Sequence, residues 1–555
     1  MTPSPTPALV TQRAARRLPR VALLLLCAAY VLPGVFGRDP WRNADLSAFG
    51  LMLGMAEGRT PWLAPTLGGW PAETALLPHW LGAWAIQALP FFDPALAARL
   101  PFAALLAATL ALVWYATFHL ARTEAAQPVA FAFGGEADPV DYARALADGA
   151  VLALVATLGL LQLGHETTPE LAQLSLVALW LWALAAAPYR GLLAQFTAMA
   201  ALAALALSGA PSMATAMGLA ALPTCGRSRY PGVRALLPWV AAGLGLVLVG
   251  TTLADAWHWR VGWARHSQEP MGLLRLPLWF LWPAWPLVLW TLWRWREHLQ
   301  SRHIAVPLGS ALVALSAMLL MDGSDRALLL ALPGVAVLAA FALPTLQRGT
   351  SAAIDWFSVF FFTVAAIAGW VVYASMQWGL PARPLLNIRR LAPGFEPRFD
   401  LIALLLALAG TLAWLWLVRW RTARHREALW KSLVLPASGV TLAWLLAMTL
   451  WLPALDYGRS PRPLIELLGA HVPAGSCVRA PGMNRSMVAA LEVFGHYQVH
   501  AVDGEASVPG DCNVLLLQGR QAQPPVVPGW TLAATLRRPA ERQERTWVLR
   551  RAAQP

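Results

Sequence analysis

Charged residues are scarce in this chain, and long apolar runs fill most of it. Asp, Glu, Lys and Arg make up 13% of the 555 residues, and hydrophobic residues make up 58%. An ordinary soluble domain carries roughly 25% charged residues. The scarcity of charge excludes a protein that is soluble throughout, and the length of the apolar runs indicates a polytopic membrane protein.

Lysine is nearly absent, since Lys431 is the only one, and arginine provides most of the net charge of +13. The arginines cluster in short loops between apolar runs, and no soluble segment combines basic residues with interleaved aromatics. Nucleic-acid binding needs such a basic surface. We therefore expect no nucleic-acid partner and attribute the charge to loops beside the bilayer.

Cysteine is also rare, with four residues in all. Cys27 lies in an apolar run and Cys225 in a short basic loop, so neither thiol suggests chemistry. Cys477 and Cys512 both fall in the C-terminal region, which the topology argued below places outside the cytoplasm. Oxidising compartments permit disulfides. We therefore predict a bridge between these two cysteines, with two separate thiols as the alternative.

About thirteen apolar runs are long enough to cross the ~30 Å hydrocarbon core as helices. They lie at about 21–37, 99–121, 145–164, 170–188, 190–208, 211–223, 235–256, 277–295, 305–321, 327–346, 355–377, 400–418 and 433–453. A further apolar stretch, 74–92, decides the orientation, because counting it as a span would move every later loop to the other side. Arginine-rich loops stay in the cytoplasm only if 74–92 lies on the outer surface, where Pro78 and Pro90 interrupt it.

The predicted organisation has three parts. Residues 1–20 form a cytoplasmic N-terminus, and 21–453 form a transmembrane domain whose loop 38–98 lies outside and carries surface helices. The first run is a retained anchor, because no small-residue cleavage site follows it. Residues 454–555 contain strand-length apolar runs around one helical pattern, which predicts a small periplasmic α/β domain.

Three acidic residues stand at the predicted outer membrane surface. Asp45 and Glu73 lie in the loop 38–98, and Glu170 follows the third apolar run. Asp45 precedes apolar residues at helical spacing, so it could simply cap a short helix. Carboxylates beside a bilayer are costly unless they have partners or a function, and three such acids at one surface exceed what capping requires. We therefore favour a catalytic role for the three acids.

Cationic side chains are predicted on the same side of the membrane. Arg59, Arg265, His266 and Arg326 lie in outside loops. Guanidinium groups bind phosphate through two parallel hydrogen bonds, so we assign the three arginines, together with His266 beside Arg265, to substrate phosphate binding. The tryptophans near them are better explained as an interfacial aromatic belt.

This pattern resembles the GT-C glycosyltransferases, and within them the branch of protein O-mannosyltransferases and lipid A aminoarabinose transferases. Asp45 matches the acid that opens that family's first outside loop, and 71–81 resembles its Glu-Lys-Pro-Pro motif. The turn 168–170 resembles its Thr-Pro-Asp turn, and 99–101 matches its Arg-Leu-Pro. The lysine of the second motif is Thr74 here, and the acid of the turn is a glutamate.

The resemblance implies an α-helical GT-C membrane protein with about thirteen transmembrane helices and a small C-terminal α/β domain. It implies a glycosyltransferase that moves a sugar from a polyprenyl-phosphate donor to a lipid or protein acceptor at the outer face of the bacterial inner membrane. Asp45 would act as the base and Glu170 would assist the acceptor. Glu73 with His266 would position the leaving phosphate or hold a divalent metal, the one cofactor that the resemblance suggests.

Two other interpretations stay open from the sequence. A transporter or flippase of lipid-linked substrates would also need many spans, but transporters place ionisable residues near the bilayer midplane. Here such residues concentrate at the ends of the spans. A non-catalytic scaffold could keep the GT-C fold after losing the family's lysines, one replaced by Thr74 and one missing from the turn 208–211.

Overall fold

The computed structural model describes residues 6–41, 43–72, 75–257, 270–422, 428–502, 512–541 and 543–551. The chain forms two compact units. We call the first, which consists of 1–33, 102–367 and 405–446, the helical unit. The second, the mixed unit, consists of 34–101, 368–404 and 447–555. Each unit is described by itself below.

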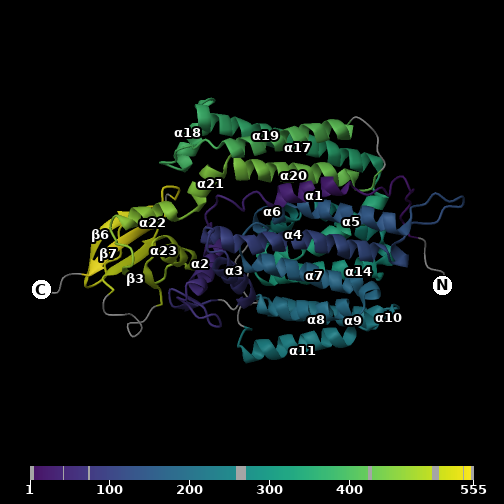
Figure 1. The fold of residues 1–555 in the computed structure, drawn as a ribbon, viewed down its shortest axis with the longest axis horizontal. Helices are drawn as coiled ribbons and strands as arrows, with labels where there is room; N and C mark the ends of the chain where they lie inside the picture. The colour runs from purple at the N-terminus through teal and green to yellow at the C-terminus, as the bar shows by residue number, and fades with distance from the viewer. Residues whose placement is uncertain are drawn as a thin grey trace. The chain divides into compact units, whose positions relative to one another are not determined.

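Apolar helices build the helical unit (Figure 1). In chain order they are α1 (Arg20–Val31), α4 (Pro94–Ala121), α5 (Pro139–Ala156), α6 (Leu158–Leu163), α7 (Pro169–Arg190), α8 (Leu192–Leu207), α9 (Pro211–Gly226), α10 (Pro231–Arg234), α11 (Leu237–Leu253), α12 (Pro270–Phe280), α13 (Ala284–Arg294), α14 (Arg302–Leu320), α15 (Asp325–Leu329), α16 (Leu332–Ala340), α17 (Arg348–Trp378), α19 (Leu401–Thr422) and α20 (Lys431–Thr449). The helices α4, α17, α19 and α20 continue into the mixed unit at one end.

Every apolar run predicted to span the membrane overlaps at least one of these helices, although the run 21–37 is helical only as far as Val31. Among the described residues, seven helices are long and apolar enough to cross a membrane alone. The residues of α12 and α13 add an eighth span if the pair counts as one, although it bends by 93°. The bend falls beside Pro283, which supplies no backbone N–H to a continuous helix.

The stretch predicted as a surface helix is α3 (Leu76–Ala88). Its 13 residues extend only ~20 Å as a helix, which is less than the thickness of the hydrocarbon core. The helix α1, in the first predicted span, has 12 residues. Helix length alone therefore does not distinguish the predicted surface helix from the predicted first span.

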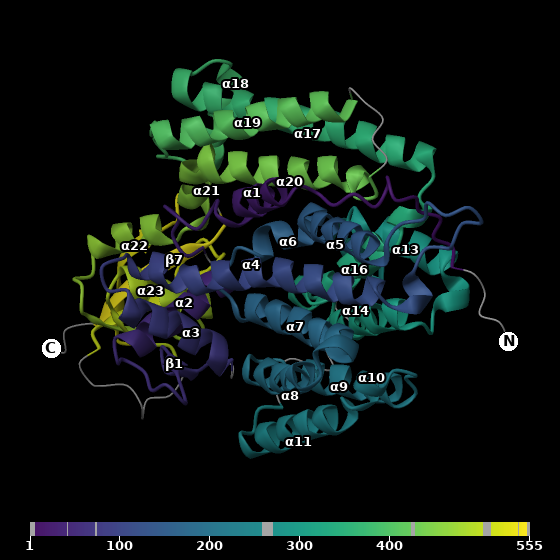
Figure 2. The same ribbon diagram turned by 45° about the vertical axis from the view of Figure 1, so that its right-hand side comes forward.

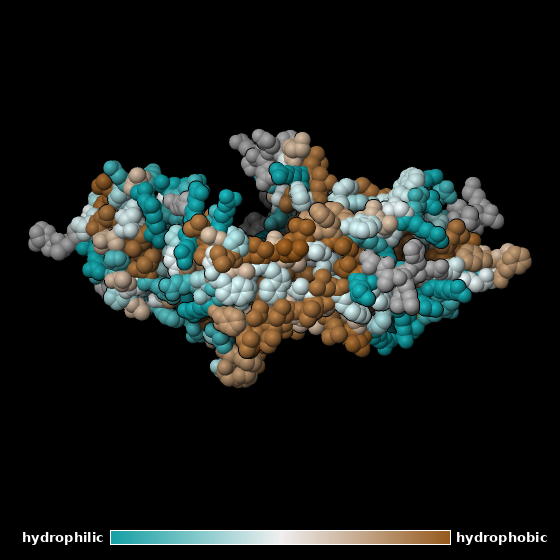
Figure 3. Space-filling model, turned by 90° about the horizontal axis from the view of Figure 1, so that it is seen from above, coloured by the Kyte–Doolittle hydropathy of each residue, from teal (hydrophilic) through white to brown (hydrophobic). Residues whose placement is uncertain are grey.

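Much of the exposed surface of the helical unit is apolar, and Figure 3 shows large hydrophobic areas on one face of the molecule. The helix α19 exposes Leu405, Leu412 and Trp416. The helix α17 exposes Trp356 and Phe360. Large contiguous apolar surfaces mark contact with a membrane or with a partner. Together with the apolar helices, they identify a polytopic membrane protein.

Buried polar groups hold chain segments within the helical unit. Asp148 of α5 is 3% exposed, and it accepts hydrogen bonds from the Leu18 amide at 2.7 Å and from the Trp114 indole at 2.8 Å. The first bond fixes the segment that precedes α1. Arg302, at the start of α14, donates to the Leu184 carbonyl of α7. That carbonyl lies four residues before Pro188, which has no N–H to offer it.

A five-stranded sheet and short helices build the mixed unit. Its helices are α2 (Ala44–Ala56), α3, α18 (Ala382–Leu391), α21 (Leu452–Arg459), α22 (Arg462–Gly469) and α23 (Arg485–Phe494). Its strands are β1 (Thr66–Leu67), β2 (Trp70–Pro71), β3 (Cys477–Arg479), β4 (Gln498–His500), β5 (Val514–Gly519), β6 (Trp530–Leu536) and β7 (Arg545–Arg551). The strand order is β4-β3-β5-β7-β6, with β3 parallel to β4 and β5, and β7 antiparallel to β5 and β6.

The α/β pattern predicted for the C-terminal region matches most of this sheet. Four of its strands and the helix α23 fall at the predicted positions. The strand β6 was not predicted, because most of its side chains are exposed and its sequence alternates weakly. A disulfide joins Cys477 of β3 to Cys512, which lies just before β5, across a Cα–Cα distance of 4.8 Å.

The helix α2 packs closely on α23, and Figure 2 shows the two helices together. A Cβ added to Gly50 of α2 would lie 2.9 Å from the Ala489 Cβ of α23, so glycine permits this approach. Glu492 of α23 accepts a hydrogen bond from the Gly68 amide at 2.9 Å. The C-terminal segment thus holds the loop segment 38–72 through both packing and polar contacts.

Candidate functional site

Asp45 lies in the first turn of α2, at the second helical position, and it is 1% exposed. Asn43, and not Asp45, occupies the N-cap position. The Oδ2 atom of Asp45 accepts hydrogen bonds from the Trp41 amide at 3.0 Å and from the Arg38 guanidinium at 3.3 Å. Asp45 is therefore a buried side chain held by an arginine and a backbone amide, and it is not the N-cap of the helix.

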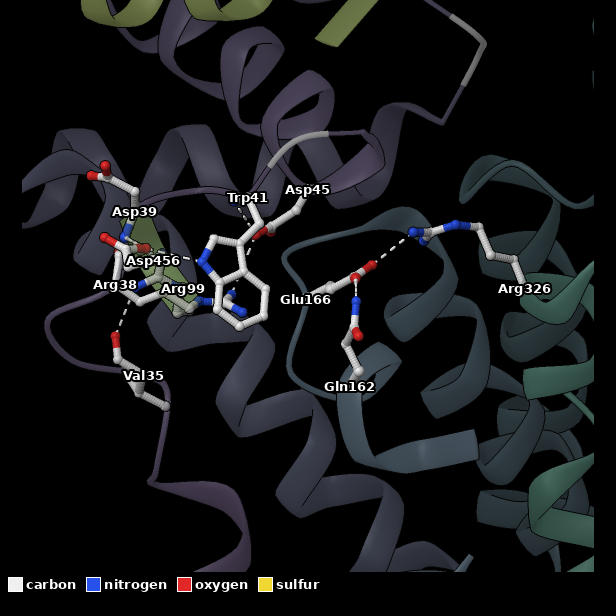
Figure 4. Close-up of polar contacts among 10 residues, drawn as sticks. All are labelled: Val35, Arg38, Asp39, Trp41, Asp45, Arg99, Gln162, Glu166, Arg326 and Asp456. Atoms are coloured by element: carbon white, nitrogen blue, oxygen red, sulfur yellow. Dashed lines mark hydrogen bonds and ion pairs between the residues drawn. The ribbon is translucent and has the colours of Figure 1, made fainter. Parts of the chain in front are cut away.

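The loop that carries Arg38 is clamped by a second buried arginine. Arg99 of α4 is 4% exposed and donates to the Val35 carbonyl at 2.8 Å and to the Arg38 carbonyl at 3.0 Å (Figure 4). In the sequence, Arg99 stands out only as part of the Arg-Leu-Pro motif. The structure gives it a positioning role, because its guanidinium fixes the backbone on either side of the turn before Asp45.

Two further aspartates extend this network within the mixed unit. Asp456 accepts hydrogen bonds from the Asp39 amide at 3.0 Å and from the Trp41 indole at 2.9 Å (Figure 4). Burial, together with the negative charge of Asp39, raises the pKa of Asp456 to about 6. Asp39 itself forms a bidentate ion pair with Arg462, at 2.6 and 2.8 Å.

Trp41 also contacts cations, since the guanidinium carbons of Arg38 and Arg459 lie 4.5 and 4.6 Å from its ring centroid. Such contacts are cation–π interactions. Sequence reasoning missed this network because most of its partners are separated by more than 400 residues.

A second cluster lies in the helical unit, where two glutamates share one arginine. Arg326 of α15 donates to Glu166 at 2.7 Å and to Glu170 at 3.2 Å. Gln162 donates to the other oxygen of Glu166 at 3.0 Å (Figure 4). Both glutamates are 5% exposed. Glu170 occupies the second position of α7, as Asp45 does in α2, and Thr168 occupies the N-cap.

His165 precedes this glutamate pair and is held on both sides. Its two ring nitrogens lie 2.7 Å from the Leu161 carbonyl oxygen and 2.8 Å from the Tyr30 carbonyl oxygen. Its ring centroid is 4.4 Å from that of Trp444. Carbonyl oxygens only accept hydrogen bonds, so a ring nitrogen that carries a proton can donate to the carbonyl beside it.

The structure places the other predicted residues as follows. Glu73, Arg265 and His266 lie outside the described residues, and so does the metal site predicted for Glu73 and His266. Arg59 pairs with Glu57 at 2.6 Å and with Glu492 of α23 at 3.1 Å. The guanidinium predicted to bind phosphate is therefore engaged by two carboxylates.

Only one group of potential metal ligands is found among the described residues. It consists of Cys477, His500 and Cys512. Its two cysteines form the disulfide described above.

Comparison with known proteins defines the class to which this fold belongs. The sequence matches no protein-family model and no curated protein. Its structure shares its fold with the solved structures described next, which confirms the predicted α-helical membrane fold with a small C-terminal sheet domain.

The fold is shared with ArnT from Cupriavidus metallidurans. The structure of ArnT bound to undecaprenyl phosphate superposes with a TM-score of 0.60 at 14% sequence identity, covering 96% of this chain and 97% of that chain. The apo structure of ArnT also gives 0.60 at 14% identity, covering 95% of this chain and 96% of that chain.

Proposed function

We propose that this protein transfers a sugar from a polyprenyl-phosphate donor to a lipid or protein acceptor at the outer face of the bacterial inner membrane. The observation that carries the proposal is the buried Asp45, held by Arg38 and a backbone amide at the start of α2, in a chain with the GT-C fold. The likeness to ArnT, whose structure holds undecaprenyl phosphate, supports a lipid-linked donor.

Asp45 is the general base in this proposal. Its carboxylate takes the proton from an acceptor hydroxyl, and the hydroxyl oxygen attacks the anomeric carbon of the donor sugar. The bond between that carbon and the phosphate oxygen breaks, and polyprenyl phosphate leaves with the electron pair. Arg38 and the Trp41 amide fix the carboxylate, so the base needs no rearrangement before it accepts the proton.

The second cluster has a different proposed role. Glu170 assists the acceptor, and Arg326 contributes positive charge toward the phosphate as it leaves. The side chain of Arg326 is 23% exposed, whereas those of its glutamate partners are 6% and 7% exposed, so the cation is the accessible member of the cluster. Arg59, Arg265 and His266 are further proposed phosphate ligands, and Glu73 with His266 is the proposed metal pair.

The proposed orientation places the N-terminus in the cytoplasm and the C-terminal region in the periplasm. It rests on the arginine-rich loops, which cytoplasmic positions favour. The Cys477–Cys512 disulfide agrees with this orientation, because disulfides persist in the periplasm and are rare in the cytosol.

The test measures what the donor releases, so the sugar need not be known in advance. The purified protein is reconstituted in lipid nanodiscs with the lipid-linked sugars extracted from cells that lack the gene, and with envelope membranes of those cells as acceptor. Mass spectrometry then measures the release of free polyprenyl phosphate. We expect release with the wild-type protein and a loss of at least 100-fold with Asp45→Asn.

Glu57→Gln is the matched control, because Glu57 ends the same helix with a side chain that is 47% exposed. It should release polyprenyl phosphate at the wild-type rate. Equal release by Asp45→Asn and Glu57→Gln would remove Asp45 from the mechanism. No release by the wild-type protein would contradict the transferase itself.

A further inference from the structure

One helix of the mixed unit belongs neither to the candidate site nor to the C-terminal sheet. The helix α18 joins the end of α17 to the start of α19 (Figure 1), and both of these helices are long and apolar enough to cross a membrane. None of the residues of α18 is buried. The mechanism proposed above uses no residue of α18, so its exposed surface needs a separate explanation.

Hydrogen bonds hold α18 beside the last turn of α17. The Ser375 hydroxyl donates to the Pro381 carbonyl and accepts from the Leu385 amide at 2.9 Å. The Gln377 side chain donates to the Arg398 carbonyl at 3.3 Å. Ser375 lies in the last turn of α17, and one turn of helix is ~5.4 Å long. The helix α18 is therefore fastened at the level where α17 ends.

The length of α17 places this level in the headgroup layer of a bilayer. Its 31 residues extend ~46 Å as a helix. The hydrocarbon core is only ~30 Å thick, and the bilayer with its headgroups is ~40–45 Å thick. The helix α17 therefore extends beyond the hydrocarbon, and a helix fastened to its last turn lies at the membrane surface.

The apolar side chains of α18 continue the exposed apolar surface of the two spans. Leu386 is 60% exposed and Leu391 is 71% exposed. Trp378 at the end of α17 and Leu401 at the start of α19 are exposed as well. Because the spans contact lipid, apolar side chains that continue their surface contact the same lipid.

Arginines share the exposed face of α18. Arg383 and Arg389 are exposed, and they stand three residues before and three residues after Leu386. Residues three apart are neighbours on one face of a helix. Neither arginine forms an ion pair with another residue in the described part of the chain. A leucine between arginines at the membrane surface is typical of helices that bind anionic lipid.

We infer that α18 lies in the headgroup layer of the membrane and binds the phosphate groups of anionic phospholipids through Arg383 and Arg389. Leu386 and Leu391 contact the acyl chains of the same lipids, while the guanidinium groups stay among the headgroups. Guanidinium groups match phosphate through paired hydrogen bonds. The inference goes beyond the proposed transferase function, because it concerns the lipids around the protein and neither the donor nor the acceptor.

The test measures which phospholipid lies beside α18 in the full-length protein. A fluorophore is attached to Asn387→Cys, an exposed position of α18, after Cys27 and Cys225 have been replaced by serine. The labelled protein is reconstituted in nanodiscs of phosphatidylcholine that contain a small fraction of a spin-labelled lipid. That lipid is either phosphatidylglycerol, which is anionic, or phosphatidylcholine, with the spin label at the top of the same acyl chain.

We expect both spin-labelled lipids to quench the fluorophore, because α18 lies at the membrane surface. Quenching by phosphatidylglycerol should exceed quenching by phosphatidylcholine by about tenfold at equal lipid fraction, since two arginines face the anionic headgroups. An absence of quenching by both lipids would contradict the position of α18. Equal quenching by the two lipids would contradict the binding of anionic headgroups.

Variants show whether the two arginines cause the preference. Arg383→Gln/Arg389→Gln should make the two lipids quench equally, whereas Arg383→Lys/Arg389→Lys keeps the positive charges and should keep most of the preference. The matched control is Arg520→Gln/Arg537→Gln, which removes two exposed arginines of the C-terminal region and should behave like the wild type. A glutamine variant that keeps the preference, or a lysine variant that loses it, would overturn the inference.

A last comparison distinguishes lipid headgroups from free phosphate. Inorganic phosphate and sodium chloride are added at equal ionic strength, and the preference for phosphatidylglycerol is measured again. The two salts should weaken it equally, because screening acts on any exposed charge. A preference that phosphate abolishes and chloride does not would identify a site for the free anion and contradict a lipid site.

Discussion

The two carboxylate clusters differ in exposure. Asp45 accepts hydrogen bonds from the Arg38 guanidinium and from the Trp41 amide and is 1% exposed. Glu166 and Glu170 share Arg326, whose side chain is 23% exposed. The first cluster thus holds a buried carboxylate, whereas the second presents an accessible cation. A base needs a fixed position, and a phosphate ligand needs an accessible charge, so each arrangement suits the role proposed for it.

Asp45→Asn should have the largest effect on the rate of transfer. A smaller effect would contradict the proposed difference between the two clusters. Asparagine can still accept the Trp41 hydrogen bond, so the fold should persist, but it cannot take a proton. We expect the rate of transfer to fall by about 10²–10⁴-fold. Glu170→Gln should lower the same rate by only about tenfold, because Glu166 remains to pair with Arg326. Equal losses in the two variants would show that the clusters do not differ in the way proposed.

Arg326→Gln should destabilise the helical unit, because it leaves two buried glutamates without their shared guanidinium. Removing one partner of a buried ion pair costs about 3–5 kcal/mol, which thermal unfolding in detergent will measure. Adding Glu170→Gln to this variant should recover part of the loss, because one buried charge disappears. An unchanged unfolding temperature in the single variant would contradict the buried charge balance described here.

Removing the disulfide tests whether this bridge stabilises the mixed unit, which contains the Asp45 segment. The bridge closes a separation of 35 residues, and a crosslink of this size stabilises a domain by about 3 kcal/mol. Replacing Cys477 and Cys512 by serine should lower the stability of the mixed unit and increase proteolysis there. Cys27→Ser, which touches no bridge, is the control. If the double variant resists protease as the wild type does, the C-terminal region does not depend on the bridge.

The smallest predicted effect concerns Asp456 and the dependence of folding stability on pH. Its pKa is raised from an ordinary value of 3.8 to about 6, so the folded state binds its proton more tightly than the unfolded state does. The stabilisation is complete below pH 3.8 and is lost as pH rises through about 6. Asp456→Asn should therefore reduce the difference in stability between pH 4 and pH 8 by on the order of 2 kcal/mol. An identical pH profile in the variant would refute this.

Much of the architecture could be predicted from local patterns. The apolar runs predicted the helices because hydrophobic length and composition are properties of a single segment. Most strands of the C-terminal sheet could be predicted for the same reason, and β6 could not, since its exposed side chains carry little periodic signal. The short motifs predicted a fold that the structure shares with ArnT.

The contacts of the candidate site were harder to predict. Asp45 and Glu170 stood out because an acid beside an apolar run is unusual. Their partners did not stand out, since Arg38 is one of many arginines and Asp456 lies 417 positions after the amide it binds. Glu166 carried the same signal as Glu170 but was not selected, and only the geometry shows that both bind Arg326.

The most direct test of the central claim is mass spectrometry of envelope glycolipids and glycoproteins from four strains. These express the wild type, Asp45→Asn or Glu57→Gln, or lack the gene. We predict a sugar adduct in the wild type and in Glu57→Gln that disappears both in Asp45→Asn and in the deletion, with a mass that identifies the sugar class. An adduct that persists in the deletion would contradict the transferase. An adduct that is lost in the deletion but persists in Asp45→Asn would contradict Asp45 as its base.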